Sequence, residues 1–540
     1  MGIKKYVANS DNTIVNAFKS NLSTRATGSN TGYADIVETF SIYGRQSTGS
    51  VELSRILMKF PVNSITVDRN NGVLPASGSV SFHLRLYNAP HSKAVPEDFT
   101  LVVEPVSKEW QEGTGLDLET YKDLTKGNAG SNWMSASKTT AWTSTGGDYI
   151  STGNAAYPYR WYSQTFATGL EDMEIDITGL VELWMAGTLN NYGVGIHFTG
   201  SEEGYYSRSD DGTYEGWKEN ATGSTISYYT KRFFARQSQY FFMRPTIEAR
   251  WDSTKKDDRG DTYYSSSLAP VNDNINTLYL YNYVRGELRD IPSIGTGPIY
   301  VSFYSGSDDN AKSSGQAASS SAATRAAIKL PTTLPHLWVP NDTNPYVVTG
   351  AHVSTGIYSA SFAITGTSAP ITTIFDVWHD GSGKNKPWAG TEFFTSSFNP
   401  INFSASQTIQ KPVYYLSVTN LKDRYRGDES ARFNLYIRNK YWQPTIYTTA
   451  NATVESSTIQ SASYRVFRLM DGYEAIPYGT GSDICTGLSY DISGNYFDLD
   501  MNLLEAGYAY GIRFSFYDPS LKSWTEQRET FKFRVEDYEY

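Results

Sequence analysis

The chain has 540 residues, which is too long for one hydrophobic core and predicts about three or four domains. Its formal net charge of −10 argues against binding to a nucleic-acid backbone, because phosphate contacts require a basic surface. The single cysteine, Cys485, excludes an intramolecular disulfide framework, and we expect it to be a buried small hydrophobic side chain.

The N-terminal sequence MGIKKYVANSDNTIVNAF lacks the apolar run of a signal peptide. No stretch approaches the roughly 20 apolar residues that a membrane-spanning helix needs. We therefore expect synthesis in the cytoplasm and no insertion into a membrane.

Alternation of apolar and polar residues predicts β-strands throughout the first half of the chain. From Ser79 to Tyr87, every second residue between Val80 and Leu86 is apolar and the residues between them are mostly polar. The 41 tyrosines suit such strands, because their rings fit a half-buried pleated surface. The other strands expected in this half cover Ser54–Phe60, Leu101–Val106, Met173–Ile177, Gly193–Phe198, Tyr240–Met243 and Thr246–Trp251.

Only one segment has a convincing helical period. In Thr178–Met185, the apolar residues Leu180, Leu183 and Trp184 fall on one side at three- and four-residue spacing. We expect this helix, and we expect helix in less than about a tenth of the chain.

Two polar stretches indicate the domain organisation. Residues 252–262, DSTKKDDRGDT, are charged and contain no hydrophobic side chain, which is typical of a solvated linker. The Ser-, Ala- and Gly-rich run from Ser305 to Ala327 is expected as a long loop. The predicted organisation is a first domain over 1–252, a linker over 253–273, and further domains over 274–407 and 408–540.

The last two domains show a common order of motifs, which predicts a diverged tandem repeat. Trp388 lies 39 residues after Thr349, and Trp524 lies 38 residues after Thr486. Aromatic strands occur at similar positions between these landmarks. We expect Gly350 and Gly487 to be equivalent residues of two immunoglobulin-like sandwiches.

Five motifs occur in the same order as in a known family. They are Arg55-x-Leu57-x-x-Phe60, Phe82-x-Leu84-x-Leu86-Tyr87, Trp110-x-Glu112-Gly113-Thr114, Ile175-Asp176-Ile177-Thr178 with Val181 and Trp184, and Gly193-Val194-Gly195-Ile196. Residues 1 to 252 thereby resemble the DNRLRE domain, a jelly-roll-like β-sandwich counted among carbohydrate-binding modules. The expected fold is all-β, with this N-terminal jelly-roll-like sandwich followed by two immunoglobulin-like sandwiches.

No converging set of acid, base, nucleophile or metal ligands is evident, so we predict no enzyme and no cofactor. His379-Asp380 is the most catalytic-looking pair, but it also fits a strand end followed by a turn. The paired acids Glu202-Glu203 and Asp210-Asp211 are expected in a solvated loop. The sequence Asp210-Asp211-Gly212 leaves calcium open as an alternative, because clustered oxygens suit that ion, although EF-hand spacing is absent.

Two stretches, Leu116–Phe166 and Tyr205–Lys231, are longer than the DNRLRE pattern requires and are rich in aromatic residues. Their rings are candidate contacts to a partner protein or to a glycan, although packing in the core is also compatible with them. The candidate contact residues are Trp133, Trp142, Trp161, Tyr205 and Tyr206.

The arrangement of the domains and the N-terminal sequence resemble virion structural proteins of large tailed phages of aquatic bacteria. This resemblance implies a non-enzymatic virion component of the head, neck, tail or baseplate, made in the host cytoplasm. Its partners would be other virion proteins and copies of itself. The alternative is a receptor-recognition protein that binds a host-surface glycan.

Overall fold

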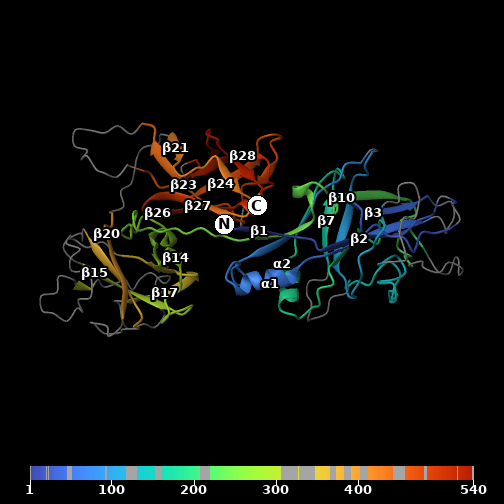
Figure 1. Ribbon diagram of the computed structural model, residues 1–540, viewed down its shortest axis with the longest axis horizontal. Helices are drawn as coiled ribbons and strands as arrows, with labels where there is room; N and C mark the ends of the chain where they lie inside the picture. Colours follow the sequence, from blue (N-terminus) through green and yellow to red (C-terminus); the bar gives the residue numbers. More distant parts are fainter. Residues whose placement is uncertain are drawn as a thin grey trace. The chain divides into compact units, whose positions relative to one another are not determined.

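The computed structural model is an all-β protein with 46% strand and 6% helix, which confirms the all-β part of the expected fold and the low helix content (Figure 1). The chain divides into two compact units. The N-terminal unit contains Gly2–Asp252 and the short segment Thr480–Cys485, and the C-terminal unit contains Ser253–Gly479 and Thr486–Tyr540. The structure describes residues 2–19, 21, 24–44, 51–91, 94–116, 130–151, 161–206, 219–305, 326–327, 347–364, 373–381, 391–401, 412–441, 456–479, 483–519 and 521–537.

The described residues of the N-terminal unit form two antiparallel sheets. The smaller sheet has the order β1 (Ile3–Val7), β11 (Thr246–Arg250), β5 (Ser81–Leu86) and β8 (Met173–Asp176). The larger sheet has the order β10 (Ser227–Phe234), β3 (Ile36–Tyr43), β4 (Glu52–Lys59), β9 (Val194–Phe198), β6 (Phe99–Pro105) and β7 (Tyr162–Phe166), with β2 (Ser10–Asn16) paired to β4.

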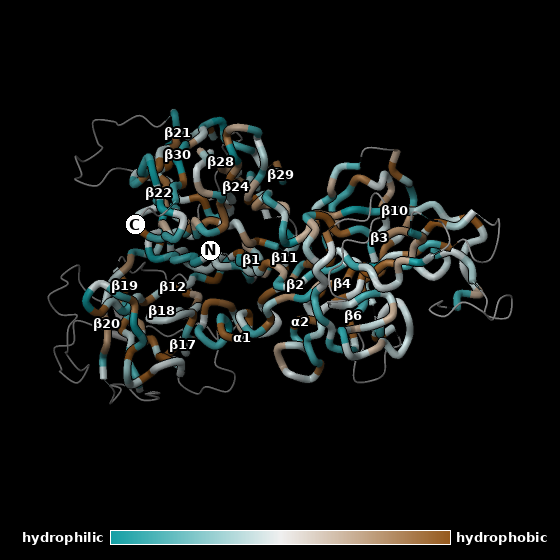
Figure 2. The backbone as a smooth tube through the Cα atoms, turned by 45° about the vertical axis from the view of Figure 1, so that its right-hand side comes forward, coloured by the Kyte–Doolittle hydropathy of each residue, from teal (hydrophilic) through white to brown (hydrophobic). Residues whose placement is uncertain are grey.

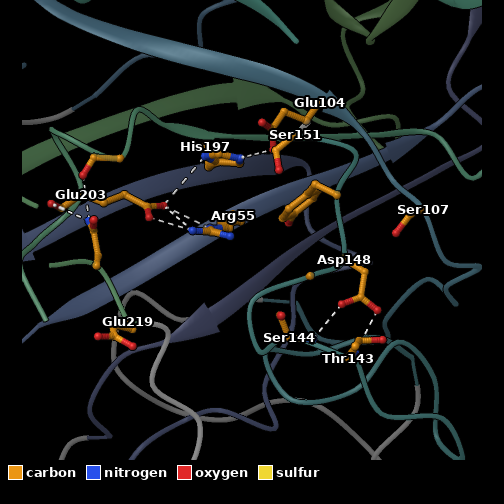
Figure 3. Close-up of a pocket in the computed structure, with 14 residues that line it drawn as sticks. Arg55, Glu104, Ser107, Thr143, Ser144, Asp148, Ser151, His197, Glu203 and Glu219 are labelled. Atoms are coloured by element: carbon orange, nitrogen blue, oxygen red, sulfur yellow. Dashed lines mark hydrogen bonds and ion pairs between the residues drawn. The ribbon is translucent and has the colours of Figure 1, made fainter. Parts of the chain in front are cut away.

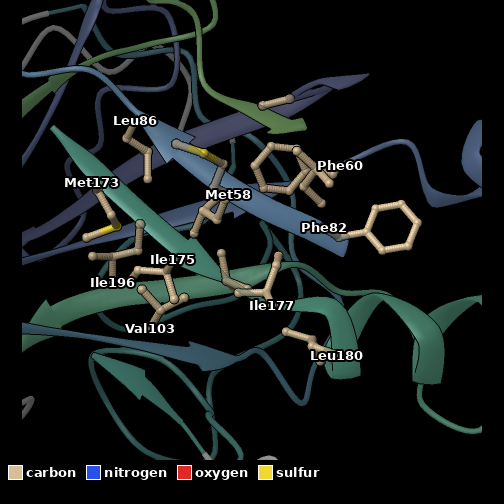
Figure 4. Close-up of a cluster of buried hydrophobic side chains, with 14 of the residues drawn as sticks. Met58, Phe60, Phe82, Leu86, Val103, Met173, Ile175, Ile177, Leu180 and Ile196 are labelled. Atoms are coloured by element: carbon tan, nitrogen blue, oxygen red, sulfur yellow. The ribbon is translucent and has the colours of Figure 1, made fainter. Parts of the chain in front are cut away.

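Alternating side chains of both sheets build the main core of this unit. Phe82, Leu84 and Leu86 of β5 are fully buried, as the sequence alternation predicts. They belong to the same cluster as Met58 of β4 and Val103 of β6, which come from the larger sheet (Figure 4). Figure 2 shows hydrophobic and hydrophilic residues alternating over short distances along such strands. The cluster gives the N-terminal unit the character of a β-sandwich.

Two helices, α1 (Val62–Asn70) and α2 (Thr178–Met185), pack on one another in this unit. Helix α2 confirms the sequence prediction, and the hydroxyl of Thr178 fixes its start by accepting a hydrogen bond from the Phe82 amide at 2.8 Å. Helix α1 was not predicted, because β-branched and short polar residues dominate it. Arg69 of α1 donates to both carboxylate oxygens of Glu182 of α2 at 2.7 Å.

Residues 483–485 belong to the N-terminal unit, although they lie far along the chain. Asp483 accepts a hydrogen bond from Arg250 at 3.2 Å and another from the Ser81 hydroxyl at 3.3 Å. Cys485 is buried as expected, and burial raises the pKa of its thiol to about 11.

The described residues of the C-terminal unit form three large sheets and a two-stranded hairpin, β13 (Tyr283–Val284) with β14 (Glu287–Leu288). The first sheet has the order β12 (Asn276–Tyr281), β18 (Ile357–Phe362), β17 (Val347–Ser354), β15 (Ile299–Ser305), β19 (Ile374–His379) and β20 (Glu392–Phe398), with β16 (Ala326–Ala327) on β15. The second is β21 (Tyr414–Val418), β23 (Ser430–Asn439), β27 (Gly494–Asp500) and β26 (Ser489–Asp491). The third is β22 (Arg424–Arg426), β30 (Phe531–Glu536), β28 (Ala509–Asp518), β24 (Ala462–Arg468) and β25 (Glu474–Ile476), with β29 (Ser523–Glu526) on β28.

The prediction of equivalent strand positions in a tandem repeat was wrong. The first repeat pairs its opening strand β12 with β18, whereas the matching strands of the second, β21 and β27, both pair with β23. Gly350 lies inside β17, but Gly487 forms only an isolated bridge with Ser463. Alternation of aromatic residues determines which face of a strand is buried, but it does not determine which other strand pairs with it.

The prediction of a solvated linker after Asp252 was also wrong. Thr262 is fully buried and Tyr264 belongs to the core that contains β12, β15 and β18. At least one charged side chain of this segment is paired with a buried residue: Arg259 forms an ion pair with the buried Asp376 of β19. Polar residues of this segment therefore act as partners of buried groups in the C-terminal unit, and the segment is not a solvated linker.

Candidate binding site

A buried arginine lies at the centre of the larger sheet. Ile56 and Met58 of β4 point into the main core, so Arg55 and Leu57, which alternate with them along the strand, point to the opposite face of the sheet. Arg55 is only 1% exposed, because residues that include Trp133 cover this face.

Arg55 donates hydrogen bonds to the carboxylate of Glu203 and to the backbone of Gly146. Its Nη2 donates to both carboxylate oxygens of Glu203, at 2.8 and 2.7 Å, and its Nε donates to Oε1 at 3.1 Å. Its Nη1 donates to the backbone carbonyl of Gly146 at 3.3 Å. A fully buried guanidinium needs such a partner, since an unpaired buried charge is strongly destabilising.

His197 of β9 and Glu104 of β6 lie on neighbouring strands beside this pair. His197 Nδ1 lies 2.8 Å from the backbone carbonyl of Phe198, which can only accept, so Nδ1 carries a hydrogen. Nε2 then faces Glu104 Oε2 at 3.2 Å, and this contact requires a further proton on one of the two groups. In either arrangement the His197–Glu104 pair has no net charge.

Asp148 and Tyr149 occupy the loop that borders these strands. Burial alone would raise the pKa of Asp148, but hydrogen bonds from the amides of Thr143 and Ser144, at 2.9 and 2.8 Å, lower it. The Tyr149 hydroxyl donates to Gly146 at 2.8 Å, and burial raises its pKa.

These groups line a cavity of about 480 Å³ (Figure 3). The volume falls within the usual range of small-molecule sites, but the lining is polar. Figure 3 shows that the side chains come from several strands and from the loop around Asp148. The lining residues are Arg55, Glu104, Ser107, Thr143, Ser144, Gly147, Asp148, Tyr149, Ser151, His197, Gly200, Glu203, Glu219 and Asn220.

The structure corrects three of the five aromatic candidates. Trp133, Trp142 and Tyr206 are buried in a second core of the N-terminal unit, so their rings do not reach a surface partner. The indole of Trp142 donates to the Asn132 carbonyl at 2.8 Å. Trp161 is 52% exposed and Tyr205 is partly exposed, so both remain compatible with surface contacts.

The paired acids Glu202-Glu203 were wrongly expected in a solvated loop. Glu203 is buried against Arg55, and Glu202 accepts a hydrogen bond from the Thr100 amide at 2.8 Å. A sequence signal for the site existed: Arg55 interrupts the apolar strand around it, and an arginine in such a position needs an acidic partner. The calcium alternative at Asp210-Asp211-Gly212 lies outside the described residues.

His379 is a core residue at the end of β19. Its Nε2 lies 3.0 Å from the Ser302 hydroxyl, and burial lowers its pKa to about 4. Strand β19 ends at His379, as the interpretation of a strand end predicts, and Asp380 accepts a hydrogen bond from the Thr391 amide.

Within the part of the chain that the structure describes, no three His, Cys, Asp or Glu side chains are grouped so that they could hold a metal ion. No helix among the described residues is long and apolar enough to cross a membrane. The fold and the pocket thus define an all-β protein with a polar cavity in its N-terminal unit. Comparison with models of known families and with curated proteins finds no match.

Proposed function

We propose that the protein is a non-enzymatic structural component of a tailed-phage virion, a decoration or attachment protein of the head, neck, tail or baseplate. It acts through contacts with other virion proteins and with copies of itself. The observation that carries this proposal is an exposed apolar surface on β3 and β10, where Ile42 and Tyr228 lie opposite one another in register. They are 47% and 61% exposed.

This surface extends to Ile226, which is also exposed and lies two residues before Tyr228. Both residues belong to the Tyr205–Lys231 stretch for which the sequence predicts partner contacts. Clustered apolar side chains at a surface typically mark an interaction site, and tyrosine is enriched in protein interfaces. Strand β10 ends the order of its sheet, so a partner can approach this surface from the edge.

The pocket chemistry supports a binding role rather than a catalytic one. Glycoside hydrolysis needs two carboxyl groups, one as acid and one as base or nucleophile. Arg55 occupies both oxygens of Glu203, which leaves this carboxylate unsuited to either role.

At finer detail, we propose that the N-terminal unit is a DNRLRE-type jelly-roll-like sandwich and that 274–407 and 408–540 are immunoglobulin-like sandwiches. The order of the family motifs along β4, β5 and α2 supports the first assignment. The presence of two sheets within 408–540 supports the last.

Binding of a host-surface glycan is the second candidate function. Trp161 favours it, since this residue is about half exposed and an exposed indole face can stack on a sugar ring. Trp161 is therefore the residue whose replacement separates this candidate from the first.

The proposal is tested by proteomic analysis of purified phage particles and by incorporation of variants. We expect the protein in particles at a fixed copy number, and we expect Ile42→Ser with Tyr228→Ser to reduce its incorporation. Tyr283→Ser, which changes an exposed tyrosine of the C-terminal unit, is the matched control. Absence of the protein from purified particles would overturn the proposal. Saturable glycan binding that Trp161→Ala abolishes would favour the second function.

A further inference from the structure

We infer that the pocket around Glu104 binds a small organic cation that carries a primary ammonium group. The inference goes beyond the proposed function, because it does not depend on the position of the protein in a particle. It rests on the hydrogen-bonding capacity and the charge that remain in the pocket after its internal pairs are counted.

Most charged groups of the pocket neutralise one another. Arg55 and Glu203 form one pair, and His197 and Glu104 form a second pair without net charge. The carboxylate of Asp148 lies 3.6 Å from the ammonium of Lys108. These contacts leave the lining with little positive charge to offer an anion.

Two carboxylate groups retain unused acceptors. Glu219 is exposed and makes no hydrogen bond or ion pair with any described residue, so its negative charge is not balanced within the pocket. Glu104 is only 7% exposed, and its second oxygen, Oε1, accepts no hydrogen bond from the described part of the chain. Glu104 lines the cavity, so this free oxygen can accept a hydrogen bond from a ligand there.

The strong donors of the pocket are already used. Every nitrogen of Arg55 donates within the protein, and both ring nitrogens of His197 have partners. A ligand therefore has to supply donors to Glu104 and Glu219. A primary ammonium group has three donors and no acceptor, and its charge balances that of Glu219.

The ring of Tyr149 completes the site. This ring lines the cavity, and its centroid lies 5.6 Å from Cζ of the Arg55 guanidinium. A cation can therefore lie beside the ring of Tyr149. Hydroxyl groups of Ser107 and Ser151 also line the cavity and can accept from or donate to hydroxyl groups on the ligand. An amino sugar with a free amine and a linear polyamine both carry the required ammonium group.

Calorimetric titration of the full-length protein with glucosamine and with spermidine tests the inference, and N-acetylglucosamine and glucose are the neutral comparators. We expect saturable binding of at least one amine and none of either neutral sugar at the same concentrations. Glu219→Gln should weaken binding by about tenfold, since a charge-assisted hydrogen bond is lost. Glu109→Gln, which removes an exposed carboxylate outside the cavity, should leave the affinity unchanged.

Glu104→Gln provides a second variant, and its thermal unfolding shows whether the fold is retained. Preference for glucosamine identifies an amino sugar as the source of the ammonium group, and preference for spermidine identifies a polyamine. Equal binding of glucosamine and N-acetylglucosamine, or no saturable binding of either amine to the folded wild-type protein, would overturn the inference. A negative calorimetric result would overturn the inference about ammonium binding, but it would not bear on the presence of the protein in phage particles. The two proposals are therefore tested independently.

Discussion

Arg259 and Asp376 form a bidentate ion pair in which both N–O distances are 2.7 Å. Asp376 is fully buried, and the indole of Trp378 donates to the same carboxylate at 2.8 Å. One carboxylate thus joins the charged segment after Asp252 to the core of the C-terminal unit.

Removal of the cation from this pair should destabilise the C-terminal unit. Arg259→Met leaves the Asp376 charge buried, and breaking such a pair typically costs about 3 to 5 kcal/mol. We expect a lower urea midpoint for the unfolding transition of this unit. Arg289→Met, which breaks an ion pair between two exposed side chains, should cost less than about 1 kcal/mol. Equal effects of the two variants would contradict the structural role of Arg259.

Replacement of Trp133 and replacement of Trp161 by alanine should have very different effects on the free energy of unfolding. Trp133 is fully buried, so Trp133→Ala should destabilise the N-terminal unit by about 3 to 5 kcal/mol. Trp161 is exposed, so Trp161→Ala should change the free energy of unfolding by less than about 0.5 kcal/mol. Denaturant unfolding of both variants checks this. A mild effect of Trp133→Ala would show that its ring is not part of the core.

His379 should make the C-terminal unit sensitive to acid. Its pKa is about 4 in the folded protein against 6.5 for an unperturbed histidine, so the unfolded chain binds more protons between these values. Stability should therefore fall as the pH falls from 6.5 to 4, by at most about 1.4 kcal/mol per pH unit from this group. His379→Gln should reduce this slope in thermal unfolding measured across that range. An unchanged slope would exclude His379 as its source.

Asp11 should have the opposite pH dependence in the N-terminal unit. Burial raises its pKa to about 7 from 3.8, although the Arg236 amide donates to it at 2.6 Å. The folded protein therefore holds the proton more tightly, and this contribution to stability, complete below pH 3.8, is lost as the pH rises through 7. Asp11→Asn keeps an acceptor for Arg236 and should be more stable than wild type at pH 8, but not at pH 3.5. Melting temperatures at the two pH values decide this.

The spacing of apolar residues within a segment was enough to predict individual strands and one helix. The alternation around Phe82 and the spacing of Leu180 and Trp184 each specify a buried face, and the structure contains the corresponding strand and helix. Helix α1 escaped prediction because only Val62 and Ile65 are buried in it, which is too short a pattern to recognise.

Pairings between distant residues were not predictable in the same way. Arg55 and Glu203 are 148 residues apart, and Arg259 and Asp376 are 117 residues apart. Each charged residue, viewed in its own segment, is compatible with a solvated loop or with a buried pair. Only the folded arrangement of strands distinguishes these alternatives, and for the same reason the neighbours of aromatic strands could not be read from their composition.

The position of Asp483 has a consequence for inheritance of the N-terminal unit by recombination. A single genetic crossover after Asp252 would transfer the strands that carry Ser81 and Arg250, but it would leave their partner carboxylate in the donor gene. The recipient chain would have to supply a matching acidic loop more than 200 residues downstream. Exchange of this unit between related genes should therefore preserve the distant loop together with it, and the two segments are expected to vary in concert.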